Sequence, residues 1–341
     1  MMIKTLAALL TAAATLAGAA VAQAQDLTPV KFTLDWTMQG NHAIWGLAQK
    51  NGDFEKNGLK VTMDRGYGSG DTIVKVAAGA YDIGFTDINA LVKFNAENPD
   101  RALIAFYQVF DKTPNSIITL AKSGIKAPAD LAGKKLGAPE SDSSRLMFPA
   151  FAAANKIDPA SIEWVTMAPN LRETMLVQGQ VDAISGFAST SVFNLIGAGV
   201  PKDDITVLGF ADNGLDLYGS TLVATPDYVA KHPEVIKGFV KASIAGTVAL
   251  LKDPAAGMAA MKEIEPLFDV DLETARLQFL MDKGVLKSKA FEEHGLGYVD
   301  PDRMALTIKT NADAFKITAP PADKIYTTEY LPPAAERMPP K

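Results

Sequence analysis

The first 110 residues alternate between short strand-like stretches and longer amphipathic ones. Apolar and polar positions alternate in VKFTL, which begins at Val30, and helical spacing of Ile44, Leu47 and Ala48 follows Asn41. The same succession of strand, turn and helix recurs twice before residue 110. The strands predicted here are 30–34, 59–64, 81–85 and 101–110, and the helices are 42–50, 72–79 and one that ends before Pro99. Repeated strand–helix units predict an α/β fold with a largely parallel sheet.

A second series of similar units begins at Ser116, and the chain becomes mainly helical after Thr225. The strands predicted in this part are 116–121, 136–138, 163–167, 181–185, 205–210 and 220–225. The predicted helices are 125–135 with its turns, 146–155, 171–177, 189–196, 233–252, 254–264, 272–283 and 302–315. The proline-rich tail from Pro320 onward is predicted to be extended and partly mobile. A chain of this length is sufficient for two lobes.

Polar and aromatic side chains follow the carboxyl ends of several predicted strands, the edge at which open α/β sheets hold ligands. The second strand-to-helix turn is also rich in glycine, which lets the backbone approach a ligand closely, and the next helix would aim its first N–H groups there. The candidate ligand-binding residues of these turns are Asp35, Trp36, Asn41, His42, Tyr67, Ser69 and Asp87. A buried tryptophan with a capping asparagine, and a plain tight turn, are the alternative interpretations.

The second series adds hydroxyl, aromatic and charged candidates. Ser141, Ser143 and Arg145 precede a predicted helix, where they either cap it or receive a polar ligand group, with Arg145 pairing with a carboxylate or sulfonate. Aromatic side chains can sandwich a flat ring, and aspartates can accept hydrogen bonds from amines. The remaining candidates of these two kinds are Tyr107, Phe187, Asp216 and Tyr218. The alternative roles are core packing for the aromatics and capping or solvation for the aspartates.

The first 24 residues have the pattern of a secretory signal peptide. Lys4 gives a positive start, residues 6–22 are apolar, small or threonine, and Ala22-Gln23-Ala24 is a small-x-small cleavage site. A membrane anchor is the alternative, but the stretch is marginal in length and rich in alanine and threonine. We expect cleavage after Ala24 and export of the remaining chain.

The composition excludes several kinds of chemistry. The chain has no cysteine, which excludes disulfides, thiol nucleophiles, iron–sulfur clusters and a lipid-modified cysteine. The three histidines, His42, His232 and His294, show no metal-ligand spacing, so neither a metal nor a cofactor is expected. The formal net charge is −6, and no basic patch is interleaved with aromatics, so nucleic acid is not an expected partner.

Several blocks of sequence occur in the order seen in a known family. They are LDW followed by NHA, GDFEKNGL, GYGSGDTIVKVAAGAYDIGFTD, KTPNSIITL, SGIKAPADLAGKKLGAP and GQVDAISGF. With these blocks the chain resembles the periplasmic solute-binding proteins of ABC importers for nitrate, sulfonate, taurine and thiamine precursors, over nearly its whole mature length.

The resemblance implies a type II periplasmic-binding-protein fold with a ligand cleft between two α/β lobes. Lobe one would comprise residues 25–113 plus 215–341, and lobe two residues 114–214. The resemblance also implies a monomeric, non-enzymatic protein of the periplasm. Such a protein passes its small-molecule ligand to a permease in the inner membrane, which works with a cytoplasmic ATPase.

The LDW…NHA start resembles the branch that binds pyrimidine precursors of thiamine. The leading hypothesis is therefore uptake of a flat, amine-bearing heterocycle such as an aminopyrimidine. The alternative is an organic anion or nitrate, held by Ser69, Ser141, Ser143, Arg145 and helix N-termini. An alternative of another class is a pyrimidine-forming enzyme of the same fold family, which consumes its own histidine and a pyridoxal phosphate lysine adduct. His42 matches that histidine, but the enzyme's cysteine-rich iron-binding segment has no counterpart in this chain.

Overall fold

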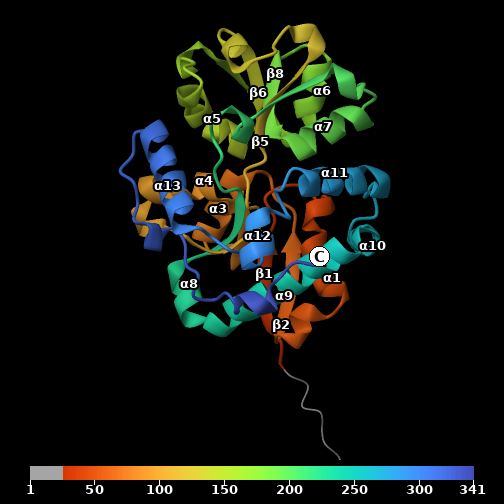
Figure 1. Ribbon diagram of the computed structural model, residues 1–341, viewed down its shortest axis with the longest axis vertical. Helices are drawn as coiled ribbons and strands as arrows, with labels where there is room; N and C mark the ends of the chain where they lie inside the picture. The colour runs from red at the N-terminus through yellow and green to blue at the C-terminus, as the bar shows by residue number, and fades with distance from the viewer. Residues whose placement is uncertain (1–25) are drawn as a thin grey trace, which may run out of the picture.

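The computed structural model describes residues 26–341, so the predicted signal peptide lies outside the described residues. The chain forms two lobes, each built around a five-stranded sheet, with one lobe above the other in Figure 1. The sheet of lobe one has the order β2-β1-β3-β10-β4. Its strands are β1 (Thr28–Thr33), β2 (Leu59–Asp64), β3 (Ile83–Asp87), β4 (Ile104–Gln108) and β10 (Ser220–Ala224).

The sheet of lobe two has the order β7-β6-β8-β5-β9. Its strands are β5 (Asn115–Leu120), β6 (Lys135–Ala138), β7 (Glu163–Thr166), β8 (Ala183–Phe187) and β9 (Ile205–Gly209). In both sheets the antiparallel strand lies second from one edge: β10 between β3 and β4, and β5 between β8 and β9. The prediction of largely parallel sheets therefore holds for the other strands, and each sheet is mixed because one strand enters it after a crossing from the other lobe.

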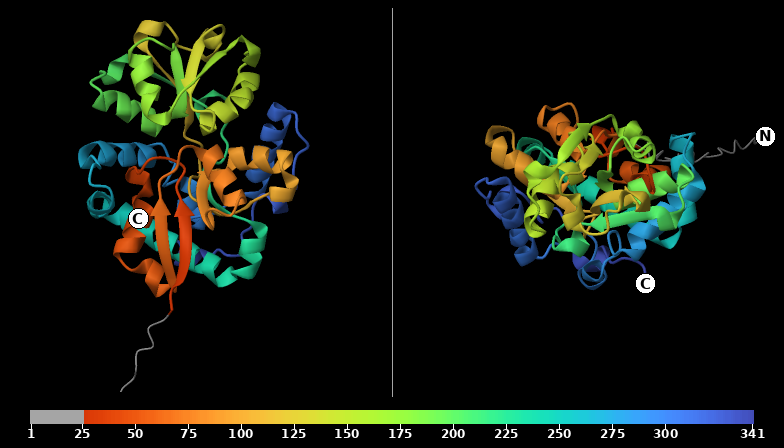
Figure 2. Two further views of the ribbon diagram at one scale, coloured as in Figure 1. Left: turned by 180° about the vertical axis from the view of Figure 1, so that it is seen from behind. Right: turned by 90° about the horizontal axis from the view of Figure 1, so that it is seen from above.

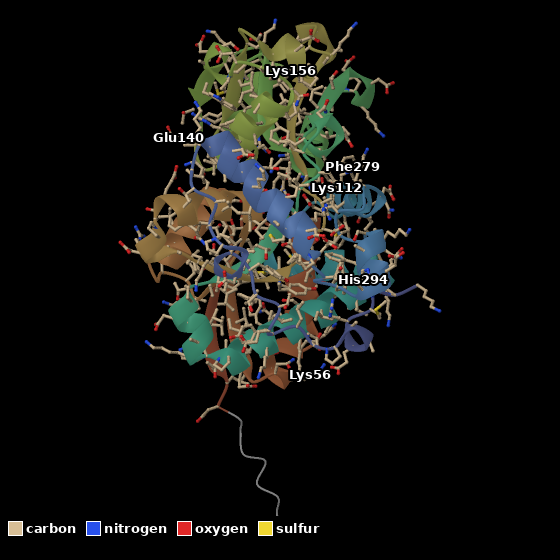
Figure 3. The ribbon with its side chains drawn as sticks, turned by 60° about the vertical axis from the view of Figure 1, so that its left-hand side comes forward. Lys56, Lys112, Glu140, Lys156, Phe279 and His294 are labelled. Carbon is tan, nitrogen blue, oxygen red and sulfur yellow. The ribbon has the colours of Figure 1, made fainter. Side chains whose placement is uncertain are left out.

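The chain passes between the sheets twice, between β4 and β5 and again between β9 and β10. Lys112 of the first crossing lies 3.8 Å from Asp212 at the start of the second, measured from Nζ to Oδ1. Figure 3 labels Lys112 at the level where the lobes meet. The two crossings thus run close together, as a hinge requires.

Helices cover both sheets, and several short ones escape sequence prediction. Lobe one carries α1 (Ala43–Lys50), α2 (Asp53–Lys56), α3 (Ser69–Ala77), α4 (Ile88–Glu97), α8 (Pro226–Lys231), α9 (Pro233–Lys252), α10 (Pro254–Ile264), α11 (Val270–Asp282), α12 (Lys289–His294) and α13 (Pro301–Phe315). Lobe two carries α5 (Ser143–Ala154), α6 (Arg172–Val177) and α7 (Ala188–Gly197). None of the helices in residues 26–341 combines the length and apolar character needed to cross a bilayer.

An aromatic cluster forms the centre of lobe one. Phe32 of β1 packs edge-on against Trp45 of α1 and against Phe239 of α9, with ring centroids 4.9 and 5.0 Å apart. The indole N–H of Trp45 donates to Ser243 Oγ over 3.0 Å, so this fully buried polar atom is satisfied. Figure 2 shows the same lobe from behind, with the first strands in red and orange. This packing fixes β1, whose carboxyl end carries the first candidate residues.

The proline-rich tail differs from the prediction. It lies along the edge strand β4, where the Ala105 amide donates to Ile325 O and the Thr327 amide donates to Ala105 O, over 2.8 and 2.9 Å. Further on, the Arg337 guanidinium donates to the backbone oxygens of Gly295 and Leu296. The expectation of a partly mobile tail is therefore wrong for these residues, because an otherwise open sheet edge binds the tail through backbone hydrogen bonds.

Candidate functional site

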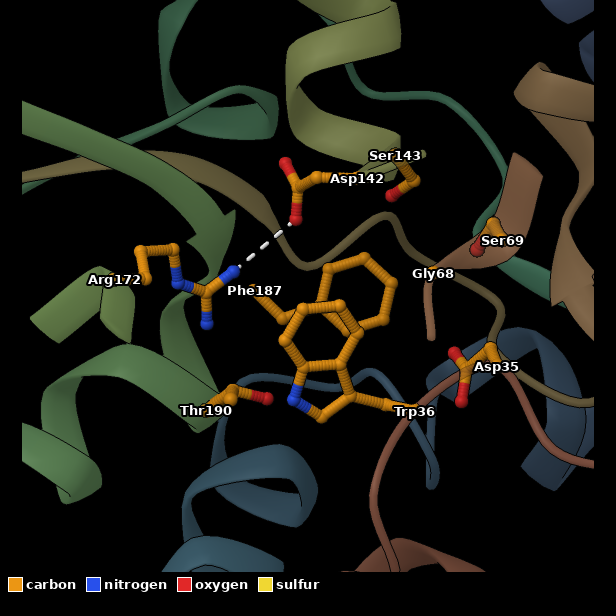
Figure 4. A pocket seen from close by; sticks show the side chains of 9 residues that line it. All are labelled: Asp35, Trp36, Gly68, Ser69, Asp142, Ser143, Arg172, Phe187 and Thr190. Atoms are coloured by element: carbon orange, nitrogen blue, oxygen red, sulfur yellow. Dashed lines mark hydrogen bonds and ion pairs between the residues drawn. The ribbon is translucent and has the colours of Figure 1, made fainter. Parts of the chain in front are cut away.

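A cleft opens between the two lobes at the carboxyl ends of their strands. It encloses about 280 Å³, counting its open mouth. Its lining comes from the turn after β1 and from the starts of α3, α5, α6 and α7, and Figure 4 shows these side chains. The lining residues are Asp35, Trp36, Gly68, Ser69, Asp142, Ser143, Arg172, Phe187 and Thr190. Both lobes therefore contribute polar and aromatic groups to one small chamber.

Asp35 and His42 form a buried pair at the base of the cleft. Nδ1 of His42 accepts the amide of Gln39 over 3.0 Å, so the ring carries its proton on Nε2. Nε2 donates to Oδ1 of Asp35 over 3.1 Å. Within residues 26–341 the other oxygen, Oδ2, has no hydrogen-bond partner, and Asp35 lines the cleft. The pair thus presents one carboxylate oxygen to a ligand.

Arg172 lies over the indole ring of Trp36, with the guanidinium carbon 4.9 Å from the ring centroid. The arginine is fully buried, and several acceptors hold its charge. Nε and Nη2 donate to Glu173 Oε1 over 3.0 and 2.9 Å, and Nη1 donates to Asp142 Oδ2 and Ser185 O, both over 3.2 Å. Arg172 is therefore a fixed part of the wall that covers one face of the tryptophan.

Three hydroxyl side chains of the lining also hold the turns in place. Ser69 Oγ accepts the amide of Asp87 over 3.2 Å. Ser143 Oγ donates to Asn115 Oδ1 over 2.6 Å. Thr190 Oγ1 of lobe two donates to Gln39 Oε1 of lobe one over 3.0 Å. Because Ser69 donates no hydrogen bond within the described residues, its O–H remains available to a ligand.

Asp87 lies directly behind the cleft, where it caps α4. Its carboxylate accepts the backbone and side-chain N–H groups of Asn89, both over 2.8 Å, and the side-chain N–H of Asn115 over 3.2 Å. Burial raises the pKa of Asp87 to about 6, although these hydrogen bonds lower it. Since Asn115 belongs to β5, this aspartate connects the two lobes rather than lining the chamber.

The charges around the chamber favour hydrogen-bond donors and cations. Among the nine lining residues of the described chain, Asp35 and Asp142 are acidic and Arg172 is basic. Arg172 is paired with Asp142 and also with Glu173, which lies just behind it. The carboxylates therefore outnumber the cation. Residues 26–341 contain no group of three or more histidine, aspartate or glutamate side chains arranged to hold a metal ion.

The structure brings together five of the residues predicted from the sequence. They are Asp35, Trp36, Ser69, Ser143 and Phe187. Three other candidates, Asn41, His42 and Asp87, are buried next to the chamber without lining it. Phe187 also packs against the hydrophobic cluster of lobe one, so it reaches across from lobe two.

The remaining candidates lie outside the lining of the chamber. Ser141 Oγ donates to Tyr67 O over 2.7 Å at the rim, where the Tyr67 ring is half-exposed. Tyr107 is buried in the core of lobe one. Arg145 donates to Ala138 O and Thr166 Oγ1 and lies over Trp164. Asp216 and Tyr218 both contact Arg303 of α13 at the second crossing.

Arg172, Asp142 and Thr190 complete the chamber but are absent from the sequence prediction. The sequence contains one indication that Arg172 has a special role. It is a cation in the first turn of a helix, where the helix dipole disfavours a positive charge. Such a residue needs a compensating carboxylate. Asp142, which caps the start of α5 and lies 30 residues earlier, supplies one, and this pairing cannot be read from spacing.

Comparisons with known proteins show the family to which this chain is related. A family model described as NMT1/THI5 like matches residues 39–257. The 4-amino-5-hydroxymethyl-2-methylpyrimidine phosphate synthase of Schizosaccharomyces pombe is 23% identical over 234 residues, 66% of each chain and so just under two thirds of that protein. The formylaminopyrimidine-binding protein of Halalkalibacterium halodurans is 23% identical over 264 residues, 76% of this chain and 78% of that protein.

Solved structures confirm the fold. The alkanesulfonate-binding protein of Xanthomonas axonopodis pv. citri bound to MOPS gives a TM-score of 0.67 at 15% identity, covering 85% of this chain and 93% of that one. The expected periplasmic-binding-protein fold is therefore confirmed, as is the resemblance from which it was inferred. Since the family model spans more than half of the sequence, the chain belongs to the NMT1/THI5 like family.

Proposed function

We propose that this protein is the solute-binding component of an ABC importer and that it captures a small, flat, amine-bearing heterocycle. An aminopyrimidine is the leading candidate. The observation that carries the proposal is the pairing of an indole ring, Trp36, with the open carboxylate oxygen of Asp35 in one chamber. A heterocycle with an amino group can stack on the first and donate to the second.

The charge of the chamber supports an amine over an anion. Asp35 and Asp142 are both buried, and Arg172 already donates to carboxylates and a backbone oxygen. A sulfonate or carboxylate ligand would have to displace those partners or lie close to Asp35. Like charges in a partly dry site repel strongly, so this arrangement opposes an anion.

The size of the chamber supports a single small ring. The cleft encloses about 280 Å³ only when its open mouth is counted, so its enclosed part is much smaller than the roughly 300–1,000 Å³ of pockets for drug-sized ligands. Arg172 also covers one face of Trp36, so a ligand ring has only the other face for stacking. The proposal therefore excludes large bicyclic ligands unless the lobes are further apart.

A role in binding rather than catalysis also forms part of the proposal, although some relatives are named as synthases. His42 is almost completely buried, and both of its ring nitrogens are engaged, with the Gln39 amide and with Asp35. A histidine consumed as a substrate would need access that this position does not offer. Incubation with pyridoxal phosphate and iron should leave His42 intact by peptide mass spectrometry, and loss of His42 mass would identify an enzyme.

We also propose a cellular location and protein partners that are consistent with this role. The signal-peptide pattern of residues 1–24 supports export to the periplasm. A solute-binding protein there requires a membrane permease and an ATPase to complete the importer. Cell fractionation should recover the protein in the periplasmic fraction with Gln25 as its first residue, and recovery from the cytoplasm would contradict this.

Binding of an organic anion remains the second candidate, because the solved relative bound to MOPS has the same fold. The specific observation in its favour is that three helices of eight or more residues, α3, α5 and α7, start at the chamber. In this case Arg172 would have to give up some of its present hydrogen bonds in order to bind the ligand.

Calorimetry on the mature chain, residues 25–341, distinguishes the two candidates. We would titrate aminopyrimidines, taurine, alkanesulfonates and nitrate into the parent, Trp36→Ala, Asp35→Asn and Arg145→Ala proteins. Aminopyrimidine binding that is lost in Trp36→Ala and Asp35→Asn supports the proposal. Arg145→Ala is the matched control, because Arg145 lies outside the lining. Anion binding that survives Trp36→Ala, or pyrimidine binding unchanged by both cleft variants, would overturn it.

A further inference from the structure

Arg276 of α11 reaches from lobe one to the first turns of α7 in lobe two. Its Nη1 donates to Ser189 O over 2.8 Å and to Thr190 O over 3.0 Å. Its Nη2 donates to Asn194 Oδ1 over 3.0 Å. The side chain is 1% exposed, so these hydrogen bonds lie in the interior of the junction between the lobes. Thr190, one of these partners, lines the cleft.

Glu273, one turn earlier on α11, connects the same arginine to the opposite wall. Its Oε2 accepts Nε of Arg276 over 2.9 Å and the backbone amide of Gly40 over 2.7 Å. Gly40 belongs to the segment between Asp35 and His42, which also carries Trp36. The segment packs tightly on α11, since a Cβ at Gly40 would lie 2.5 Å from Glu273 O.

Glu273 and Arg276 thus connect the two walls of the cleft through hydrogen bonds. Glu273 holds the segment that carries Trp36, and Arg276 holds the turn that carries Thr190. Closely placed hydrogen bonds from a guanidinium to several acceptors are stronger than neutral ones, especially where water is excluded. Separating the lobes would break the contacts of Arg276 with α7, whereas the pair with Glu273 lies entirely within lobe one and would survive.

We infer that Glu273 and Arg276 are an interlobe lock: a pair of positioning residues that stabilises the closed arrangement of the cleft and slows release of the ligand. The effect on closure does not depend on which ligand binds. Only the effect on release rests on the proposed function. Weakening the hydrogen bonds between Arg276 and α7 should favour separated lobes, and strengthening them should favour closed lobes.

Distances between spin labels can measure closure directly, because the chain has no cysteine of its own. Exposed labelling sites are Val74 on α3 of lobe one and Leu171 before α6 of lobe two, which are 49% and 46% exposed. In a Val74→Cys/Leu171→Cys background, Arg276→Lys should shift the distance distribution to longer values, because an ammonium cannot reach all three acceptors. Asn194→Ala should do the same to a smaller extent.

Asn194→Ala also protects the test against a folding defect. Asn194 is only partly buried, and this variant leaves the Glu273–Arg276 pair intact. Arg101→Lys, at an exposed position of lobe one, is the matched control and should leave the distances unchanged. Thermal unfolding of each variant checks that the protein is folded at the temperature of the measurement.

Ligand release supplies the second measurement. With the ligand found by calorimetry, stopped-flow dissociation should be about tenfold faster in Arg276→Lys and also faster in Asn194→Ala, with the association rate little changed. If the distances are the same in the parent and both variants, the lock is wrong whatever the ligand. If the distances lengthen as expected but no ligand of the proposed class binds, the lock stands and the proposed function fails.

Discussion

Oδ1 of Asp35 lies 3.1 Å from Nε2 of His42, and this bond holds in place a carboxylate that lines the cleft. The histidine is itself fixed by the Gln39 amide, which donates to Nδ1. If the proposed function holds, His42 acts on the ligand only through Asp35. This arrangement explains why a histidine next to the site can matter for binding without contacting the ligand.

Replacing His42 by phenylalanine should weaken ligand binding and lower stability. A hydrogen bond to a charged group contributes roughly 1.5–3 kcal/mol, and Asp35 would be left buried without its donor. We expect affinity to fall about tenfold or more, measured by calorimetry, together with a lower unfolding midpoint. His232→Phe is the control, since His232 is exposed, and equal effects of the two changes would refute this role for His42.

Alanine at Gly68 should hold the cleft open. Gly68 of lobe one has φ +122°, and a Cβ there would lie 2.5 Å from Ser141 Oγ and 2.6 Å from Ser141 O of lobe two. Closure would then require a shift of backbone atoms, and the left-handed conformation adds strain of roughly 1–3 kcal/mol. Spin labels at Val74→Cys and Leu171→Cys should report longer distances, and ligand affinity should fall.

Gly79→Ala separates steric contact from backbone strain. Gly79 also has a positive φ, +73°, but a Cβ there meets nothing within 4 Å. This control should lose stability without lengthening the distance between the labels. If Gly68→Ala and Gly79→Ala give the same distance distribution as the parent, Gly68 does not limit closure.

The sequence could predict much of the cleft because strand ends meet at one edge of a sheet. Asp35 and Trp36 follow β1 in lobe one, whereas Ser143 follows β6 and Phe187 ends β8 in lobe two. Periodicity placed each of them at a strand end, and the family resemblance implied the cleft in which the two lobes bring them together. Helix α9 was predicted with its observed bounds, since Pro233 starts it and its apolar spacing continues to Lys252. The local pattern of apolar and polar residues was therefore sufficient to predict the strand-end positions and the bounds of α9.

The parts of the fold and of the site that the sequence did not predict depend on contacts between distant segments of the chain. Tyr107 lies next to the end of β4, as predicted, but the pleat turns its ring into the core rather than toward the cleft. The tail resembles a linker in composition, yet the edge of β4 binds it. Arg276 gave no signal at all, because its partners on α7 lie more than 80 residues away in the chain. Such pairings are set by tertiary packing rather than by spacing.

The stability of the protein should depend on pH through Asp87. Burial raises the pKa of this carboxyl from 3.8 to about 6, so the folded state binds its proton more tightly than the unfolded state does. Between about pH 4 and pH 6 the free energy of unfolding should therefore fall as pH rises, by roughly 3 kcal/mol from this group. Asparagine at this position cannot titrate.

Urea unfolding of the parent and Asp87→Asn proteins isolates this contribution. The unfolding free energy of the parent relative to the variant should be highest near pH 4 and should decline through pH 6 to a constant value above it. Groups other than Asp87 cancel in the difference. A difference that stays constant from pH 4 to pH 7.5 would show that Asp87 titrates alike in both states.

Arg303 of α13 should stabilise the hinge by joining its two crossings. Its Nη1 donates to Asp111 Oδ1 over 3.0 Å in the first crossing, and its Nη2 donates to Asp216 Oδ1 over 3.2 Å in the second. Its guanidinium also lies over the Tyr218 ring, 4.3 Å from the centroid. Arg303→Leu should lower stability at pH 7 by about 1–3 kcal/mol, because Asp111 is buried and loses its countercharge.

The pH dependence of that loss tests its cause. Burial raises the pKa of Asp111, and Arg303 lowers it, so removing Arg303 should raise this pKa further. The loss caused by Arg303→Leu should then become smaller as the pH is lowered, because a protonated Asp111 does not need the cation. Asp216→Ala is the control, since that side chain is 66% exposed and its pair should contribute less than about 1 kcal/mol. Equal losses at pH 4 and pH 7, measured by urea unfolding, would attribute the effect of Arg303 to its packing on Tyr218 instead.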